Sequence, residues 1–450
     1  MDFLTYVNEH KEEIIDELKD LLRIPSVLDY YDEESETPFG EAIHEALSHM
    51  IALAKKDGFI TKNVQNYAGH IEYGEGEEIL GVLCHLDVVP PGDNWTNPPF
   101  SPTIKEGKIY ARGAMDDKGP TIAAYFALKF LKDLNIKLSK RVRIILGTDE
   151  ETAWRGIKKY FETEEMPTLG FAPDASFPLI YGEKGMLSFD VLGKYDGKDG
   201  LISFESGERY NVVPDKASAT LSIDLKKPFN NFLKHNGFKG EIEGNTYIIH
   251  GKNAHAMQPH LGVNAGFILA QFLKEHFNNP IINFIHEYLS FDAFGEKLKI
   301  DYRHDEMKEF TMNTGIFRYN ESEVRLGVNC RYPKGFELDE AIEKIKKAVK
   351  KHKLSYDQKG NIPIHYVDPN DELIIKLMAA YQKITNDMET KPFTIGGGTY
   401  ARSLNKAVAF GMVMPGRKDV AHQVDEHIFI DDLIEATAIY MEAIFSLAHE

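Results

Sequence analysis

Within residues 79–95, ILGVLCHLDVVPPGDNW, an imidazole and a carboxylate interrupt an apolar run near its end. The segment 79–89 has the continuous apolar pattern of a strand that is buried on both faces of a parallel sheet. His85 and Asp87 interrupt it two residues apart, so both side chains point to the same side of the strand. Burial of an ionisable group is costly unless the group has a partner. The candidate partners are the two residues themselves, another side chain or a metal ion.

Further polar residues collect at the ends of other predicted strands and in nearby loops. They are Glu150 and Glu151 after the strand in 141–151, Asp174 after the strand in 169–175, Asp116 and Asp117 before the helix in 119–134, and His422 in the loop 418–428. In open α/β sheets, ligands bind beyond the carboxyl ends of the strands. Three carboxylates and two imidazoles would form a reasonable shell for two divalent ions that share one bridging carboxylate.

Each of these residues also has an explanation that involves no ligand. The chain has 17 histidines, and a given one is more often a hydrogen-bonded structural residue. Asp87 could orient His85, the paired glutamates could begin a helix, and the two aspartates before the predicted helix could cap it. Asp174 could cap a turn, and His422 could be solvated. The alternative to a dinuclear site is thus a structural polar cleft, which is weakened because the candidates recur where one pocket would form.

The order of the predicted elements indicates a sheet that could position these residues. In residues 1–183, strands alternate with helices, which is typical of a mostly parallel twisted sheet with helices on both faces. Residues 184–364 contain period-two strands joined by Gly, Asn and Asp turns, and we interpret them as an inserted α+β lid domain of two lobes. The helical pattern resumes in 365–450. We therefore predict one α/β domain that is interrupted by a second domain.

The composition limits the partners and the location of the chain. A formal net charge of −18 over 450 residues argues against nucleic-acid binding, which requires a basic face. Two cysteines, Cys84 and Cys330, cannot form a disulfide framework and favour a reducing compartment. Residues 1–24 predict an amphipathic helix, not a signal peptide, and no run of about 18 apolar residues predicts a membrane span. We therefore expect a cytoplasmic protein with no nucleic-acid or membrane partner.

Several blocks of the sequence resemble, in order, those of a known family. The blocks are GVLCHLDVVPPGDNWTNPPF, IYARGAMDDKGP, LGTDEETAWRG, GFAPDASFP and AHQVDEH, together with RYNVVPDKA, GKNAHA and TIGGGTYAR. From about residue 10 to the end, the chain is similar to the dinuclear metallopeptidase family of aminoacylases, carnosinases and succinyl-diaminopimelate desuccinylases. Within this family it is most similar to the bacterial PepV-type dipeptidases. One block is a modest signal, whereas all of them in order are a strong one.

The resemblance implies a role for each polar residue at the strand ends. Two divalent ions, most simply zinc, with manganese or cobalt as alternatives, would be held by His85, Asp116, Asp174, Glu151 and His422. Asp116 would bridge the ions; His85 and Asp174 would complete one site, and Glu151 and His422 the other. Asp87 would bind the second nitrogen of His85 and fix its tautomer. Glu150 would be the general base of hydrolysis.

The resemblance also implies a dipeptide substrate that the lid domain helps to bind. His255, in GKNAHA, would stabilise the oxyanion of the tetrahedral intermediate. The residues that would hold the substrate are Arg331, Asn211, Gly397, Gly398 and Thr399. Arg331 and the glycine-rich loop would bind the C-terminal carboxylate of the substrate. Without the resemblance, His255 is explained as a surface loop residue and the glycines as a tight turn. A lid of two lobes favours a monomer.

The sequence leaves two alternatives to a dipeptidase, a deacylase and a non-catalytic binding protein. A deacylase of N-acyl amino acids or a succinyl-diaminopimelate desuccinylase would use the same metal centre with a different pocket. A non-catalytic binding protein on this scaffold is disfavoured, because the ligands and Glu150 are present. Cys84, next to His85, is expected to face the opposite side of the strand as a small core residue. The alternative is that its position beside a ligand makes the site sensitive to oxidation.

Overall fold

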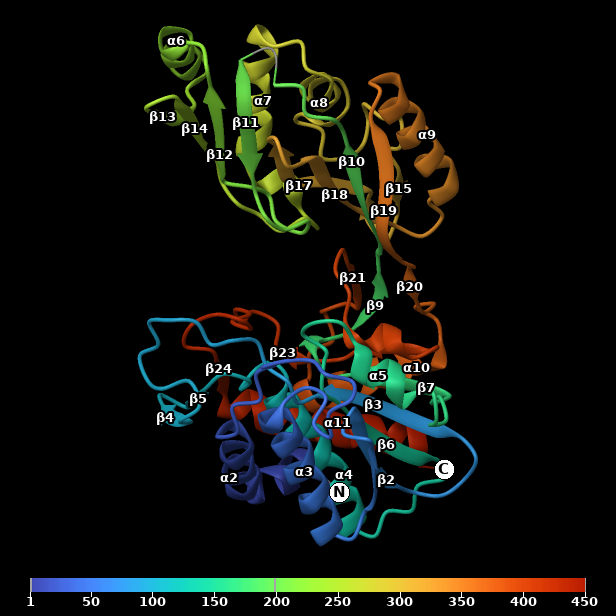
Figure 1. The fold of residues 1–450 in the computed structure, drawn as a ribbon. Coiled ribbons are helices and arrows are strands. Elements are labelled where there is room, and N and C mark those ends of the chain that lie inside the picture. The colour runs from blue at the N-terminus through green and yellow to red at the C-terminus, as the bar shows by residue number, and fades with distance from the viewer. Residues whose placement is uncertain (1, 198–199, 450) are drawn as a thin grey trace. The chain divides into compact units, whose positions relative to one another are not determined.

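The chain folds into two compact units, which are visible in the computed structural model of residues 2–197 and 200–449 (Figure 1). The first unit comprises Met1–Tyr181, Val367–Phe393 and Thr399–Glu450, and the second comprises Gly182–Tyr366 and Thr394–Gly398. The chain passes between the units four times: within β9 (Ile180–Glu183), directly after β20 (His365–Tyr366), within β21 (Phe393–Ile395) and between Gly398 and Thr399. Within residues 2–197 and 200–449, no helix is long and apolar enough to cross a membrane.

The first unit is built on a mixed sheet in which four neighbouring strands are parallel. The strand order begins with β1 (Ile60–Val64), β2 (Ala68–Tyr73), β6 (Arg141–Gly147), β3 (Ile79–His85), β7 (Leu169–Ala172) and β22 (Ala407–Ala409), and it continues with β9 and β20. The strands β6, β3, β7 and β22 run parallel, whereas β1 and β2 are antiparallel to their neighbours. Every residue of β3 is buried, as the apolar run predicts for a central parallel strand.

Helices cover both faces of this sheet. They are α1 (Phe3–Glu9), α2 (Lys11–Leu22), α3 (Glu41–Lys56), α4 (Lys118–Asp133), α5 (Arg155–Tyr160), α10 (Glu372–Thr385) and α11 (Ile430–Ala448). Gly69 of β2 lies against Leu47 and Ile51 of α3. The next residue, His70, hydrogen-bonds to Tyr160 of α5. Because successive residues of a strand face opposite sides, α3 and α5 cover opposite faces, and the predicted α/β class is confirmed.

Two small sheets hold loops of the first unit together. One consists of β4 (Thr103–Lys105), β5 (Lys108–Tyr110) and β24 (His427–Phe429), and the other of β8 (Ala175–Ser176) and β23 (Met412–Val413). The antiparallel pairing of β5 with β24 places the segment before α4 beside the C-terminal loop that precedes β24. Two segments that are about three hundred residues apart in the sequence thus become neighbours.

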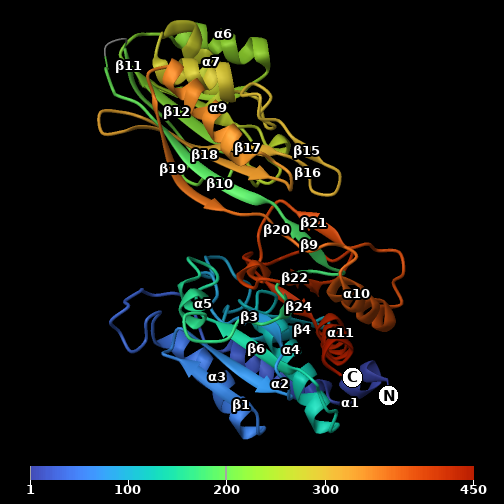
Figure 2. The same cartoon turned by 90° about the vertical axis from the view of Figure 1, so that its right-hand side faces the viewer.

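The second unit is an eight-stranded antiparallel sheet with helices packed on it (Figure 2). The strand order is β13 (Lys239–Glu243), β14 (Thr246–His250), β12 (Lys216–Leu221), β11 (Leu201–Ser206), β17 (Thr311–Tyr319), β18 (Val324–Tyr332), β10 (Gly185–Leu192) and β19 (Ser355–Ile362). Its helices are α6 (Lys226–Asn236), α7 (Ala265–His276), α8 (Pro280–Phe284) and α9 (Leu338–Lys351), and a separate hairpin joins β15 (Arg303–His304) to β16 (Lys308–Glu309). Because β11 pairs with β17, both halves of the insertion share one continuous sheet.

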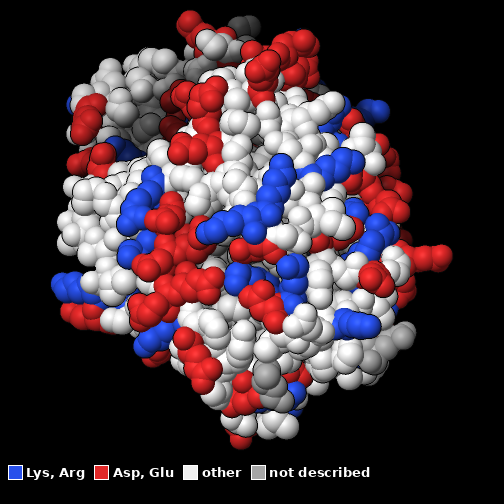
Figure 3. Space-filling model, turned by 90° about the horizontal axis from the view of Figure 1, so that it is seen from below, with Lys and Arg blue, Asp and Glu red and all other residues white. Residues whose placement is uncertain are grey.

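Aromatic side chains fill the core of the second unit. The ring of Phe272 on α7 contacts those of Phe229 and Phe232 on α6, with ring centroids 5.0 and 5.5 Å apart. On the molecular surface shown in Figure 3, Asp and Glu side chains are interspersed with Lys and Arg.

Candidate metal centre

The carboxyl ends of three neighbouring parallel strands carry the polar residues that the sequence singled out. His85 is the last residue of β3, Glu150 and Glu151 lie in the turn after β6, and Asp174 follows β7. The strands β6, β3 and β7 are adjacent in the sheet. Their carboxyl ends therefore meet at one edge, where ligands bind in open α/β sheets.

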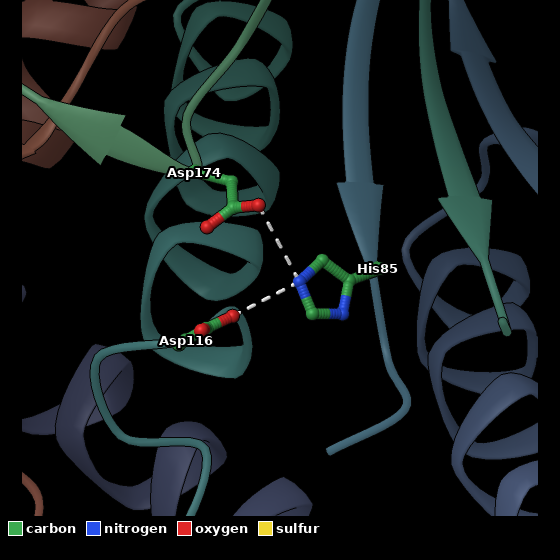
Figure 4. Close-up of side chains that lie close together, drawn as sticks. All are labelled: His85, Asp116 and Asp174. Carbon is green, nitrogen blue, oxygen red and sulfur yellow. Dashed lines mark hydrogen bonds and ion pairs between the residues drawn. The ribbon is translucent and has the colours of Figure 1, made fainter. Parts of the chain in front are cut away.

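His85, Asp116 and Asp174 point toward one another and form a first group of possible ligands (Figure 4). The His85 side chain is fully buried, and its Nε2 lies 3.0 Å from Oδ1 of Asp116 and 3.6 Å from Oδ2 of Asp174. Asp116 comes from the loop directly before α4. Three different segments of the first unit thus supply one donor each.

Asp116, Glu151 and His422 form a second group. Nε2 of His422 lies 2.9 Å from Oδ2 of Asp116 and 2.9 Å from Oε1 of Glu151. In each group, the ligand atoms all lie within 4.8 Å of one another. Asp116 directs Oδ1 to the first group and Oδ2 to the second, so its carboxylate is common to both.

The carboxylates at this edge are shielded from water and repel one another. Burial, together with the charges of Asp174 and Glu151, raises the pKa of Glu150 well above its usual range. Burial and the charge of Asp116 raise the pKa of Glu151 to about 7 and also raise that of Asp174. Hydrogen bonds to Asp116 and Glu151 raise the pKa of His422 to about 11. The cluster therefore favours bound positive charge.

The donor set fits divalent cations. Carboxylate oxygens and imidazole nitrogens are common ligands of zinc, and a mixed nitrogen and oxygen set also suits manganese and cobalt. Cations would neutralise the carboxylates that burial destabilises in their charged form. The two groups, which share Asp116, provide the donors that a pair of cations with one bridging carboxylate requires.

Asp87 connects the first group to the turn that carries the two glutamates. Nδ1 of His85 lies 3.0 Å from the main-chain carbonyl oxygen of Asp87 and 3.5 Å from its carboxylate. The carboxylate accepts the main-chain N–H groups of Glu150 at 3.2 Å and of Glu151 at 3.1 Å. The sequence reasoning assigned Asp87 to His85 alone and missed these two bonds, because the spacing of Asp87 in its own strand gives no information about the neighbouring strand.

Asp149 joins the start of the same turn to Arg155, the first residue of α5. Its buried carboxylate accepts the main-chain N–H and two guanidinium N–H groups of Arg155, at 2.7–2.8 Å. The helix α5 begins only at Arg155, so Glu150 and Glu151 do not occupy a helix start. The sequence reasoning did not single out Asp149, although it directly precedes the two glutamates.

Asp117 and Cys84 are sequence neighbours of Asp116 and His85 but are not among the possible ligands. Asp117 directly precedes α4, but its carboxylate accepts the main-chain N–H of His85 at 3.0 Å and does not cap the helix. The thiol of Cys84 is fully buried in β3. Burial raises the pKa of the Cys84 thiol well above its usual range. The thiol therefore stays protonated, and only the thiolate is strongly nucleophilic.

Residues 81–446 match the model of Peptidase family M20/M25/M40. The chain belongs to this peptidase family. It is 45% identical to a protein of Staphylococcus haemolyticus and 44% identical to one of Staphylococcus aureus, both of which are named "Putative dipeptidase". Each alignment covers 99% of this chain and 99% of the relative. The family that the sequence blocks resemble is thereby confirmed, and the M20 chain is a peptide-bond hydrolase.

Solved structures share the fold of this M20 peptidase. Human carnosine dipeptidase 1 is 14% identical, with a TM-score of 0.58 and coverage of 99% of both chains. The aminopeptidase PepT from Bacillus cereus is 15% identical, with a TM-score of 0.57 and coverage of 96% of this chain and 98% of its own. Similarity at this level of identity concerns the fold alone.

Asn211 and His255, which were predicted to act on the substrate, lie on neighbouring segments of the second unit of the M20 peptidase. Val212 and His255 form an isolated antiparallel bridge, and the carbonyl oxygen of Asn211 accepts the N–H of Ala256 at 2.9 Å. Burial and the nearby charge of Arg331 lower the pKa of His255. His255 is therefore neutral at pH 7, with Nδ1 accepting a main-chain N–H at 3.2 Å.

The remaining predicted substrate-binding residues come from β18 and from the glycine-rich loop. Arg331, in β18, is 5% exposed, and its Nε donates to Oδ1 of Asn329 at 2.9 Å. Gly397 and Gly398 belong to the second unit, whereas Thr399 belongs to the first and begins a short 3-10 turn. The roles that the resemblance implies for these residues, and for Asn211 and His255, stay predictions.

Proposed function

We propose that this peptidase is a dipeptidase that holds two divalent metal ions and cleaves dipeptides with a free C-terminal carboxylate. The observation that carries the proposal is the position of Asp116, whose two oxygens each approach a different histidine. The names of the staphylococcal relatives support dipeptides as substrates. A metal-dependent deacylase is the alternative that the experiment below distinguishes.

The five ligands would divide between two ions. His85 and Asp174 would hold one ion, Glu151 and His422 would hold the other, and Asp116 would bind both. Zinc is the expected metal, and manganese and cobalt also suit this donor set. When bound, the ions supply positive charge that polarises the scissile carbonyl group and lowers the pKa of a water molecule.

Glu150 would move the proton during hydrolysis. Its neighbour Glu151 faces His422, so the two adjacent carboxylates can take different tasks. The Glu150 carboxylate would accept a proton from the attacking water and then donate it to the nitrogen of the leaving amine. Asp87 would fix the positions of the base Glu150 and the ligand Glu151 relative to each other, because it binds the main-chain N–H groups of both.

Metal removal followed by a substrate panel tests this function. The full chain is stripped with a chelator, its metal content is measured, and zinc, manganese or cobalt is added back. The panel contains dipeptides, the matching dipeptide amides, N-acetyl amino acids and an N-succinyl diamino acid. We expect dipeptide hydrolysis to disappear on stripping and to return when two ions are bound per chain.

Two results would contradict the proposal. Full dipeptidase activity in thoroughly stripped protein would exclude the metal-dependent mechanism. Metal-dependent cleavage of the N-acyl or N-succinyl compounds, without cleavage of dipeptides, would retain the metal centre but assign the chain to the deacylases.

A further inference from the structure

A buried ion pair joins two segments of the first unit that are 314 residues apart in the sequence. Arg112, in the loop between β5 and α4, pairs through Nη1 with Oε2 of Glu426, in the loop before β24. The two side chains are 1% and 0% exposed. Neither residue belongs to the two groups of possible ligands. A buried ion pair is a costly feature unless further hydrogen bonds satisfy both partners.

The Glu426 carboxylate binds the segment that carries the shared aspartate. Its Oε1 accepts the main-chain N–H of Met115 at 2.8 Å and that of Asp116 itself at 3.2 Å. The main-chain carbonyl oxygen of Glu426 accepts the N–H of Ala111 at 3.1 Å. Glu426 thus holds the main chain on which Asp116 stands, and it lies four residues after His422.

The Arg112 guanidinium ties the same place to two further segments. Its Nη1 donates to the carbonyl oxygen of Gln423, the residue after His422, at 3.3 Å. Its Nη2 lies 3.4 Å from the carbonyl oxygens of both Pro90 and Pro91, in the segment that follows β3 and Asp87. One side chain therefore connects the loops that carry Asp116, His422 and Asp87.

The two ligand groups depend on this connection to different extents. In the first group, His85 ends a central strand and Asp174 follows another, so the sheet holds both. In the second group, His422 stands in a loop with φ of 62°, in the left-handed region, and its side chain is 52% exposed. The large parallel sheet carries neither the loop of His422 nor that of Asp116; the pairing of β5 with β24 brings these loops together, and the Arg112–Glu426 pair joins them closest to the ligands.

We propose that Arg112 and Glu426 are positioning residues that set the affinity of the Asp116–Glu151–His422 group for its cation. Loosening the pair should convert a chain that binds two divalent ions into one that retains a single ion tightly. This inference rests on the two-metal function proposed above. It predicts that loss of the pair weakens cation binding at the second group, whose ligands stand in loops, and spares cation binding at the first, where the sheet holds two of the ligands.

Glu426→Gln tests the inference with a minimal change in shape. The native carboxylate accepts two main-chain N–H groups on one oxygen and the guanidinium on the other. Glutamine has one acceptor oxygen, so its NH2 group must face either the guanidinium or the main-chain donors. Arg112→Lys is the second variant: it keeps the charge but loses the several-pronged reach of the guanidinium to Gln423, Pro90 and Pro91.

A second buried ion pair in the same unit provides the control. Arg143 and Glu72 are paired across β6 and β2 at 2.6 Å, and they are 4% and 8% exposed. They make no contact with either ligand group among the bonds of the described chain. Glu72→Gln therefore perturbs a buried pair without loosening the ligand loops, and any general loss of stability appears in it as well.

In the experiment, the metal-stripped full chain is titrated with Co²⁺ in the presence of a competing chelator, and binding is monitored by visible absorption. The metal content is measured separately after dialysis. Wild type and Glu72→Gln should bind two ions. Glu426→Gln and Arg112→Lys should bind one ion with wild-type affinity and the other about 10- to 100-fold more weakly, the usual effect of losing a group that orients a ligand.

Four results would overturn the inference. Glu426→Gln and Arg112→Lys could bind both ions as wild type does, or lose both equally, and in either case the pair would not select the second group. Glu72→Gln could reproduce the selective loss, which would make it a general effect of stability. Wild type that binds a single ion would overturn the two-metal proposal and this inference with it.

Discussion

Asp87→Asn removes one acceptor from the turn that carries the proposed base and a proposed ligand. In the native chain, one carboxylate oxygen accepts the N–H of Glu150 and the other accepts that of Glu151. Asparagine keeps one oxygen and turns an NH2 group toward the other N–H, so one bond is lost and two donors face each other. Asp87 is 2% exposed, which leaves water little access as a replacement. A buried donor without an acceptor costs about 1–3 kcal/mol of folding free energy. Where the turn relieves this cost by displacing Glu150, restoring the position of the base adds the same amount to the activation free energy, and kcat falls roughly 5- to 150-fold.

This cost should appear in kcat more than in metal content, because the turn sets the position of Glu150 while the His85 ring keeps its bond to the main-chain carbonyl oxygen of residue 87. The assay compares kcat and KM for one dipeptide, and metal ions bound per chain, in wild type and Asp87→Asn. Asp190→Asn is the matched control, since Asp190 is 1% exposed and hydrogen-bonded to Tyr210 at 2.6 Å in the second unit.

Two results would refute the reasoning. Wild-type kcat in Asp87→Asn would mean that the two main-chain bonds do not position the base. Loss of one metal ion, with unchanged kcat per fully loaded chain, would mean that Asp87 acts through His85 alone.

Three further predictions concern the base, the substrate carboxylate and acid stability. Glu150→Gln should lower kcat by about 10²–10⁴-fold with both ions retained; if more than about a tenth of kcat survives, Glu150 is not the base. If Arg331 binds the C-terminal carboxylate, a dipeptide amide should lose at least about tenfold in kcat/KM, or roughly 1.4 kcal/mol, relative to the free acid. Arg331→Ala should then lose little more on the amide, and equal cleavage of acid and amide by wild type would contradict the role. Burial and the charge of Arg143 lower the pKa of His70 from 6.5 to about 4. The unfolded chain therefore takes up this proton first, and stability that is present above pH 6.5 is lost as the pH falls toward 4, by about 3 kcal/mol in total. His70→Gln should flatten the dependence of the unfolding free energy on pH in this window, whereas an unchanged slope in urea unfolding would exclude His70 as its source.

The fold and the meeting of the polar residues could be predicted from local patterns. Alternating strands and helices indicate a parallel sheet, and the carboxyl ends of parallel strands lie at one edge. The structure accordingly brings His85, Asp174 and Glu151 to that edge. Asp116 and His422 stand in loops, and their place in the two groups was implied by the resemblance and not by periodicity.

The contacts that hold these residues could not be predicted. Asp117 occupies the position of a helix cap, yet its carboxylate binds the N–H of His85 in the neighbouring strand. Arg112 and Glu426 are distant in the sequence, and charged residues of either sign are frequent enough that no pattern selects this pair. Residue type shows that a buried carboxylate needs donors, but only the packing of strands and loops determines which donors it meets.

The division of the first unit into separate stretches of chain has a consequence for biosynthesis. His85, Asp116 and Asp174 are all translated before the second unit, whereas His422 is translated more than two hundred residues later. The strand β22, which pairs with β7 in the parallel sheet, also comes from this late stretch. A nascent chain therefore acquires all three donors of the first group early, whereas the second group lacks His422 until near the end of translation. A chain that stalls within the second unit would therefore carry the donors for one cation, but it would lack His422 and with it the complete donor set of the proposed two-ion centre.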